Sequence, residues 1–207
     1  MDSTDAADLI AEIHEDRAEN QAAESFRNRA ALMIAIMAAI LAVGGLGGGN
    51  ATDDMIENNI KASDTWAFYQ AKNVRQTMYR IEREKLQSEL AAGGLAGPAR
   101  TGAEARLKAY DSTIARYDSE PDANDPSKGE GKKELSAQAR AHEAEFDQAS
   151  ARDDNFDFAE VLLQLALVLG SVAILAVNRW ILLISAALGL LGGLLTLNGF
   201  LLLVPLP

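Results

Sequence analysis

Three carboxylates stand close together in the sequence, just past its first long uncharged run. Asp53, Asp54 and Glu57 are followed at once by two asparagines. Paired carboxylates can hold a cation or line the mouth of a pore. The alternative is a hydrated helix surface next to a membrane, where the carboxylates need no ligand. We favour that alternative and keep the three acids as a candidate cation site.

The other residues of chemical interest do not form the pattern of a known catalytic or metal site. His14 and His142 are the only histidines, and the chain has no cysteine. The second histidine of a zinc-protease helix is missing after His142. The segment 122–131 lacks the glycine and the final glutamate of a calcium-binding loop. We therefore predict a protein that is not an enzyme and that uses no metal ion or cofactor.

A cluster of glycines at 44–49 suggests nucleotide binding, but its context argues against that function. Asn50 stands where a dinucleotide fingerprint needs its third glycine, and an apolar helix precedes the cluster instead of a strand. Small residues four positions apart let helix backbones approach closely in lipid. We predict helix packing or oligomerisation for Gly44, Gly45, Gly48, Gly49, Gly189 and Gly193.

Three uncharged runs must position these residues. The runs cover 30–49, 161–177 and 180–207, and only Asn178 and Arg179 separate the last two. About 20 apolar residues in a helix cross a bilayer. We therefore expect an all-α membrane protein with three transmembrane helices, the last two forming a tight hairpin, and a long helical stalk domain between the first and second. The expected segments are an acidic N-terminal tail (1–26), first span (27–49), stalk (50–155), second span (156–177) and third span (180–205).

The predicted stalk begins with a helix that continues the first span without a break. No glycine or proline occurs from 51 to 90, and the run 91–102 should end the helix because glycine and proline cluster there. A short helix around 107–117, a polar loop at 119–131 and a last helix running into the second span should follow. Apolar or small residues in steps of three and four mark one face of the first stalk helix: Ile56, Ile60, Ser63, Ala67, Ala71, Val74, Met78 and Ile81.

Two polar residues interrupt the apolar spans. Gln164 and Asn198 need hydrogen-bond partners in lipid, so both should face other helices. Counted from the hairpin turn they fall at similar depths, about 21 and 27 Å. We expect that the two side chains can bond to each other.

The charge pattern bears on partners and on orientation. The chain has 207 residues and a net charge of −11, which argues against nucleic acid as a partner. Arg27 and Arg29 directly precede the uncharged run of the first span, and Arg179 occupies the hairpin turn. Because basic residues remain on the cytoplasmic side, we expect a cytoplasmic N-terminus and a stalk on the outer side.

The densest feature of the sequence is the segment 62–72, which reads ASDTWAFYQAK. Trp66, Phe68 and Tyr69 cannot share one helix face, so the segment should be contacted from more than one side and its aromatic rings should be buried between helices. We single out Asp64, Trp66, Phe68, Tyr69, Gln70 and Lys72 as its packing residues.

With Arg75-Gln76, and with Ala159–Gln164 and Arg179-Trp180 further on, this segment resembles a family of bacterial three-span membrane proteins catalogued as a domain of unknown function. The resemblance covers nearly the whole chain. It implies the same plan of span, stalk and hairpin. It brings no activity, ligand or catalytic residue. With the orientation derived from the basic residues, we expect a bacterial inner membrane protein with its stalk in the periplasm.

The function that we expect is a non-enzymatic membrane protein that acts as a self-associating scaffold or accessory subunit. Its partners would be the lipid bilayer, further copies of itself and another membrane protein. The alternative is a homo-oligomeric cation channel or transport subunit, with Asp53, Asp54 and Glu57 at its mouth.

Overall fold

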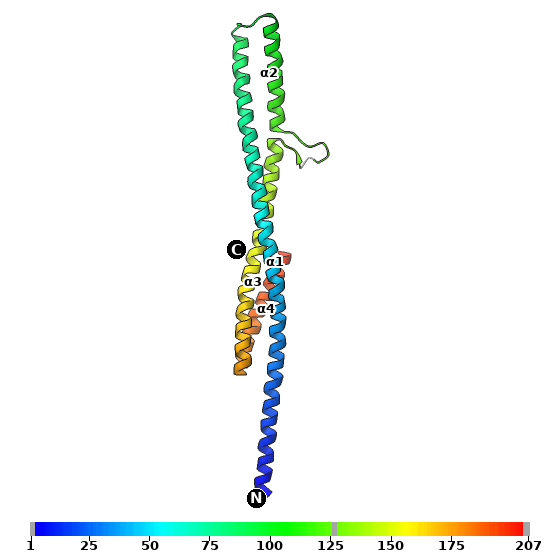
Figure 1. Cartoon of the computed structure of the whole chain (residues 1–207), viewed down its shortest axis with the longest axis vertical. Coiled ribbons are helices and arrows are strands. Elements are labelled where there is room, and N and C mark those ends of the chain that lie inside the picture. Colours follow the sequence, from blue (N-terminus) through cyan, green and yellow to red (C-terminus); the bar gives the residue numbers. More distant parts are fainter. Residues whose placement is uncertain (1–2, 126–127, 205–207) are drawn as a thin grey trace. The chain divides into compact units, whose positions relative to one another are not determined.

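The computed structural model describes residues 3–125 and 128–204, apart from the side chains of residues 3–13, 15 and 18. Residues 1 and 2 of the predicted tail and residue 205 of the predicted third span lie outside the described residues. The described chain forms four helices: α1 (Ser3–Ala91), α2 (Gly97–Asp118), α3 (Lys132–Ala176) and α4 (Arg179–Leu201) (Figure 1).

The long helix α1 confirms that the first apolar run and the start of the stalk form one uninterrupted helix. It also begins earlier than the predicted span, so the described part of the acidic segment 1–26 is helical. It ends at Ala91, two residues before Gly93, whose φ of 72° lies in the left-handed region. α2 then starts at Gly97, with a proline in its first turn, where a missing amide hydrogen costs nothing.

The predicted polar loop and the predicted hairpin turn are both confirmed. α2 ends at Asp118 and α3 begins at Lys132, which leaves 119–131 between them. At the turn between α3 and α4, the Asn178 side chain accepts hydrogen bonds from the amides of Trp180 and Ile181, at 2.9 and 3.4 Å. This is an N-cap, which satisfies amides that the first helical turn leaves free.

The last helix ends earlier than predicted. Leu202 adopts φ 47° and donates its amide to the carbonyl of Asn198 at 2.7 Å, so α4 ends at Leu201 and not at 205. Because the residues after Leu201 are also uncharged, composition alone predicted a span that reaches 205.

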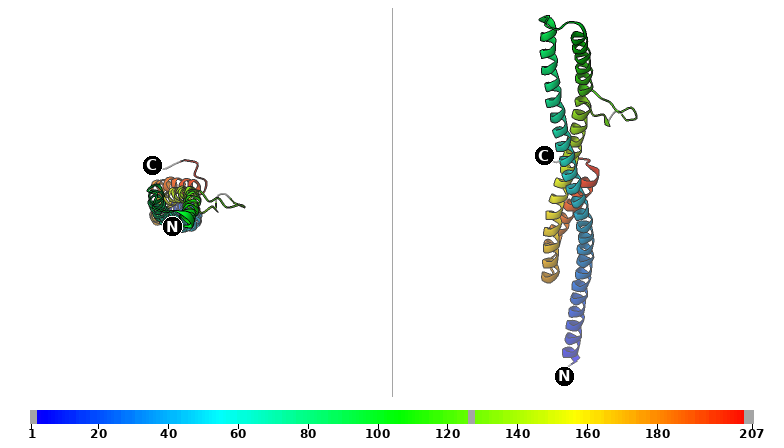
Figure 2. Two further views of the ribbon diagram at one scale, coloured as in Figure 1. Left: turned by 90° about the horizontal axis from the view of Figure 1, so that it is seen from above. Right: turned by 45° about the horizontal axis from the view of Figure 1, so that its top comes forward.

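The chain divides into two compact units. Unit 1 comprises Met1–Asp53 and Ala149–Pro207, and unit 2 comprises Asp54–Gln148. In unit 1 the first part of α1 lies alongside the second part of α3 and α4 (Figures 1 and 2). All three helices are long and apolar enough to cross a membrane. Met37, Leu163 and Ala166 form the core between them.

In unit 2 the second part of α1 packs against α2 and the first part of α3. α1 and α2 run antiparallel in this unit (Figure 1). Small residues dominate the buried positions, because they let helices approach closely: Ala62 on α1, Ala103 on α2 and Ala139 on α3 are almost fully buried.

Candidate functional site

The apolar stripe that the sequence predicts along the stalk part of α1 lies on the outside of unit 2. We call Ile56, Ile60, Ser63, Ala67, Ala71, Val74, Met78 and Ile81 the outer stripe; all eight are exposed. The large side chains among them keep about half of their surface or more, from 53% at Ile56 to 61% at Met78. Five large apolar side chains exposed along one face of a helix are unusual for a monomer and indicate an interaction surface.

The opposite side of α1 makes the contacts within unit 2, and it is more polar than the outer stripe. Its residues also recur in steps of three and four, and all are buried or half-buried: Ala62, Trp66, Tyr69, Lys72, Gln76 and Tyr79. Tyr79 lies 5.7 Å from the ring of Tyr110 and 5.9 Å from that of Tyr117 on α2, centroid to centroid. Hydrophobic periodicity alone therefore selects the wrong face of this helix as the inner one.

Lys72 is the most unusual residue of this inner face, because it is charged and only 5% exposed. Its ammonium lies 3.5 Å from a carboxylate oxygen of Glu120 and 3.4 Å from one of Glu130. It also lies over the rings of Phe68 and Tyr117, at 5.1 and 5.8 Å from their centroids. A buried ammonium requires such partners. Glu120 and Glu130 stand at the two ends of the loop 119–131, and we call these ends, residues 119–120 and 129–131, the loop base. Lys72 therefore attaches the loop base to α1.

Gln76, one turn further along α1, is 1% exposed. Its side-chain amide donates to the carbonyl oxygen of Ile114 on α2 at 2.8 Å. Together Lys72 and Gln76 attach α1 to α2 and to the loop that follows α2. Both residues belong to the segment on which the family resemblance rests, and the contacts assign them a positioning role.

The loop base is closed by a second set of contacts from α3. Glu134 accepts hydrogen bonds from the hydroxyl of Ser119 at 2.5 Å and from the amide of Glu120 at 3.1 Å. The amide of Gln138 donates to the carbonyl of Gly129 at 2.7 Å, and the Glu130 amide donates to the carbonyl of Glu120 at 2.9 Å. Burial raises the pKa of Glu134, but these hydrogen bonds to its carboxylate outweigh burial and leave the pKa below its ordinary value.

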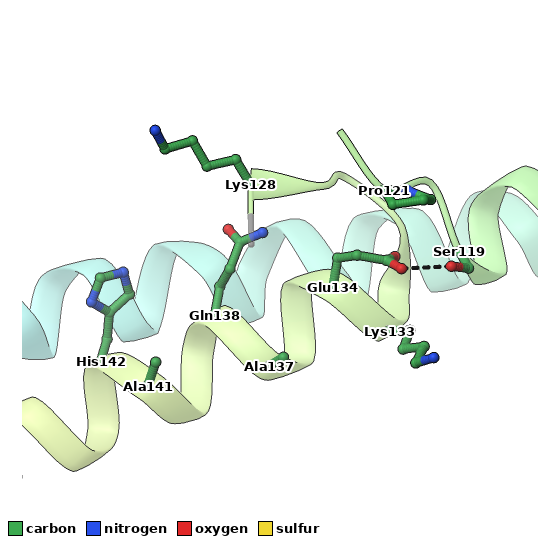
Figure 3. A pocket seen from close by; sticks show the side chains of 9 residues that line it. All are labelled: Ser119, Pro121, Lys128, Lys133, Glu134, Ala137, Gln138, Ala141 and His142. Atoms are coloured by element: carbon green, nitrogen blue, oxygen red, sulfur yellow. Dashed lines mark hydrogen bonds between the residues drawn. The ribbon is translucent and has the colours of Figure 1, made fainter. Parts of the chain in front are cut away.

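The loop leaves an open groove of about 710 Å³ along the start of α3 (Figure 3). In Figure 3 the Glu134 carboxylate points to Ser119. The carboxylate of the groove is thus engaged in holding the loop. Its lining residues are Ser119, Pro121, Lys128, Lys133, Glu134, Ala137, Gln138, Ala141 and His142.

The aromatic residues of the segment 62–72 are placed differently from one another. Trp66 is half-buried, and its indole N–H donates to the Glu143 carboxylate on α3 at 2.8 Å. Tyr69 packs edge-on against Trp66 with 5.5 Å between the ring centroids. Phe68 remains 40% exposed, so the expectation that all three rings are buried is wrong for Phe68 within one chain. Asp64 and Gln70 are exposed.

The three acids at the end of the first apolar run are exposed. Glu57 pairs with Lys61 one turn away, with 2.6 Å between the charged atoms. The hydrogen bond and the charge of Lys61 lower the pKa of Glu57. Across the described residues, no group of three or more histidine and acidic side chains is placed to hold a metal ion.

The predicted packing glycines fall into two groups. A Cβ on Gly44 would lie 3.4 Å from Thr196, one on Gly48 would lie 3.2 Å from Phe156, and one on Gly189 would collide with Met37. A Cβ on Gly193 would lie 3.8 Å from the side chain of Ile40, an ordinary contact distance. Gly45 and Gly49, in contrast, have open space beside them. Only the first group serves packing within one chain.

Further close-packing glycines escaped the sequence analysis, among them Gly47 and Gly192. A Cβ on Gly47 would lie 2.6 Å from Phe156, and one on Gly192 would lie 2.7 Å from Leu163. The sequence analysis selected glycines by their spacing along one helix, and that spacing does not show which residue of a neighbouring helix lies opposite each glycine.

The predicted bond between Gln164 and Asn198 is wrong. Gln164 is exposed and donates to Glu160 on its own helix at 2.8 Å. Asn198 instead donates to the side chain of Asn155, which is 1% exposed, at 2.7 Å. Its amide group also donates to the carbonyl of Val204 at 2.8 Å. The interhelical bond exists, but its α3 partner lies two and a half turns earlier than the sequence suggested.

Comparison with known proteins addresses the family and not the activity. No curated protein and no solved structure matches the chain. A family model described as a domain of unknown function (DUF4337) matches residues 26–202, which include the apolar helices, the outer stripe and the loop base. The chain therefore belongs to this family.

Proposed function

We propose that the protein is an integral membrane scaffold that self-associates through the outer stripe of α1. The three apolar helices would lie in the inner membrane of a bacterium, with the N-terminus in the cytoplasm and unit 2 in the periplasm. The observation that carries the proposal is the exposure of the outer stripe, because a soluble helix that leaves its most apolar face in water gains stability by covering it.

The size of the outer stripe is sufficient for a specific contact. At roughly 100 Å² for each half-exposed large side chain, the five of them present on the order of 500 Å², near the upper limit for a patch on a monomer. Two copies that pair along the stripe would bury about 1,000 Å², which reaches the lower limit of specific interfaces. Contacts between the apolar helices would add to this area.

The outer stripe of α1 is suited to a second copy of the same chain as its partner. Copies inserted in one membrane have the same orientation, so identical stripes can meet in parallel around a symmetry axis. Apolar residues in steps of three and four, as in the outer stripe of each copy, are the pattern that lets the side chains of two helices interlock. The apolar part of α1 also carries open small residues, Gly45 and Gly49, which permit close helix approach in lipid.

The cation channel predicted as an alternative has less support. Among the acids that would form its mouth, Glu57 already has a counter-charge in Lys61. A scaffold, in contrast, requires only the exposed stripe and the membrane helices. For this reason we place the scaffold first.

Disulfide cross-linking tests the proposal directly, because the chain contains no cysteine. Ile60→Cys and Met78→Cys lie on the outer stripe, whereas Asn73→Cys is an exposed control between them in the sequence that stands three or four residues from none of the stripe residues. In native membranes, mild oxidation should give covalent dimers of the two stripe variants and leave the control monomeric. Equal cross-linking at all three sites, or none at any of them together with a monomer by light scattering in mild detergent, would refute self-association.

A further inference from the structure

A second surface lies in unit 1, where α1 and α4 leave an apolar groove of about 380 Å³ between them. Met33, Ile36 and Ile40 line it from α1, and Ala186 and Leu190 line it from α4. Gly189 forms part of the same surface and allows α4 to lie against Met37, since a Cβ at this position would collide with that side chain. The two helices thus pack closely at Gly189 and Met37, and the residues around this contact line the groove.

One end of the groove carries a positive charge. Arg29 is the single charged residue of its lining, and it is exposed. It directly precedes the uncharged run that begins with Ala30. No ion pair of Arg29 occurs among the described side chains. Its guanidinium is free to bind an anion at the boundary of the apolar layer, as arginine does with phosphate groups.

The length of the groove agrees with this polarity. From Arg29 to Ile40, α1 rises about 16 Å. Half of a hydrocarbon layer of ~30 Å is about 15 Å, so the apolar part of the groove matches one leaflet. A ligand with one charged phosphate end and an apolar tail of leaflet length would satisfy both parts of the groove at once.

We infer that this groove binds one phospholipid with an anionic headgroup, its phosphate at Arg29 and one acyl chain between α1 and α4. The inference rests on the membrane insertion that the proposed function includes. It adds a specific lipid site to the general contact that any membrane helix makes with the bilayer.

The test compares two lipids and two arginines. The full-length protein in mild detergent is mixed with phosphatidylglycerol or with phosphatidylcholine, and retained lipid is counted by native mass spectrometry. The wild-type chain should retain one phosphatidylglycerol in preference to phosphatidylcholine. Arg29→Gln should weaken phosphatidylglycerol binding about tenfold, the loss expected for a hydrogen bond to a charged group.

Arg27→Gln is the matched control, because it removes the same charge two residues away from a position that does not line the groove. It should keep the preference for phosphatidylglycerol. Ala186→Phe, which fills the groove, should reduce retention of both lipids. Equal effects of the two arginine variants would overturn the inference, because they would reduce it to unspecific attraction by basic residues.

Failure of this inference is distinguishable from failure of the proposed function. If the purified protein does not float with phospholipid vesicles in a density gradient, membrane insertion and the lipid site fail together. If it floats and its outer stripe cross-links, but Arg29→Gln binds phosphatidylglycerol like the wild type, the lipid site alone is refuted.

Discussion

The ring of Phe156 on α3 occupies the space that a side chain at Gly47 of α1 would need. A Cβ on Gly47 would lie 2.6 Å from the Phe156 ring and 2.9 Å from that of Phe200 on α4. The two rings meet edge to plane, with 4.9 Å between their centroids. Gly199 on α4 also packs against the Phe156 ring, since a Cβ at position 199 would lie 2.8 Å from that ring. One aromatic side chain thus joins all three apolar helices.

The first prediction follows from this contact. Gly47→Ala should lower the stability of unit 1 by about 1–3 kcal/mol, because the added methyl group overpacks the ring of Phe156. Gly102→Ala on α2 is the control, since nothing lies within 4 Å of a Cβ at that position and it belongs to no proposed interface. Thermal unfolding in detergent, followed by circular dichroism, should separate the two variants. Equal midpoints would show that the helices do not pack as described.

The second prediction concerns the loop base. Lys72→Met leaves the carboxylates of Glu120 and Glu130 without their shared cation. Both are partly solvated, so we expect a cost of about 1–2 kcal/mol, below that of a fully buried pair. Proteinase K should then cut the loop several times faster than in the wild type. Lys85→Met, an exposed position on the same helix, should leave the cleavage rate unchanged; if Lys72→Met does so too, the loop is held by other contacts.

The third prediction is a dependence of stability on pH. The pKa of Glu134 is lowered from its ordinary value of 4.5, so its ionised form stabilises the folded state. This contribution is fully present above about pH 4.5 and is lost as the pH falls through the lowered folded pKa. As the pH falls below 4.5, the thermal midpoint of the wild type should therefore fall more steeply than that of Glu134→Gln. Glu89→Gln, exposed near the end of α1, should follow the wild type; identical profiles for all three proteins would exclude a role for Glu134.

The fourth prediction concerns orientation in the membrane. Ala123 is exposed in the loop of unit 2, and Asn20 is exposed before the first apolar run. A cysteine at Ala123 should react with an impermeant thiol reagent in intact cells whose outer membrane admits it. A cysteine at Asn20 should react only after lysis. The reverse pattern would place the N-terminus outside and contradict the orientation derived from the basic residues.

The four helices, the end of α1 and the turn between α3 and α4 could be predicted because their causes are local. Uncharged runs of about 20 residues and the glycines and proline at 93–98 lie within one stretch of chain. The same holds for the turn at Asn178, whose side chain caps the helix that follows it. Each of these signals acts over a few residues and needs no partner from elsewhere.

The partners of Asn198 and of the packing glycines depended on how the helices lie side by side. Depth along a helix, counted from the hairpin turn, does not include the rotation of each helix about its axis. Gln164 and Asn155 both lie on α3, but only Asn155 is turned toward Asn198. Likewise, spacing predicted a packing role for both Gly45 and Gly48. Within the chain only Gly48 packs against another helix, at Phe156, and Gly45 has open space beside it.

The sequence by itself determined the four-helix order, the apolar helices, the loop at 119–131 and the apolar stripe on the stalk part of α1. Only the tertiary structure decided that this stripe faces outward. The reason lies in Lys72 and Gln76, which look like surface residues in a single helix. They become buried because carboxylates at 120 and 130 and a carbonyl at 114 supply their partners from distant parts of the chain. A buried polar group is stable only with such partners, and no periodicity within one helix reveals them.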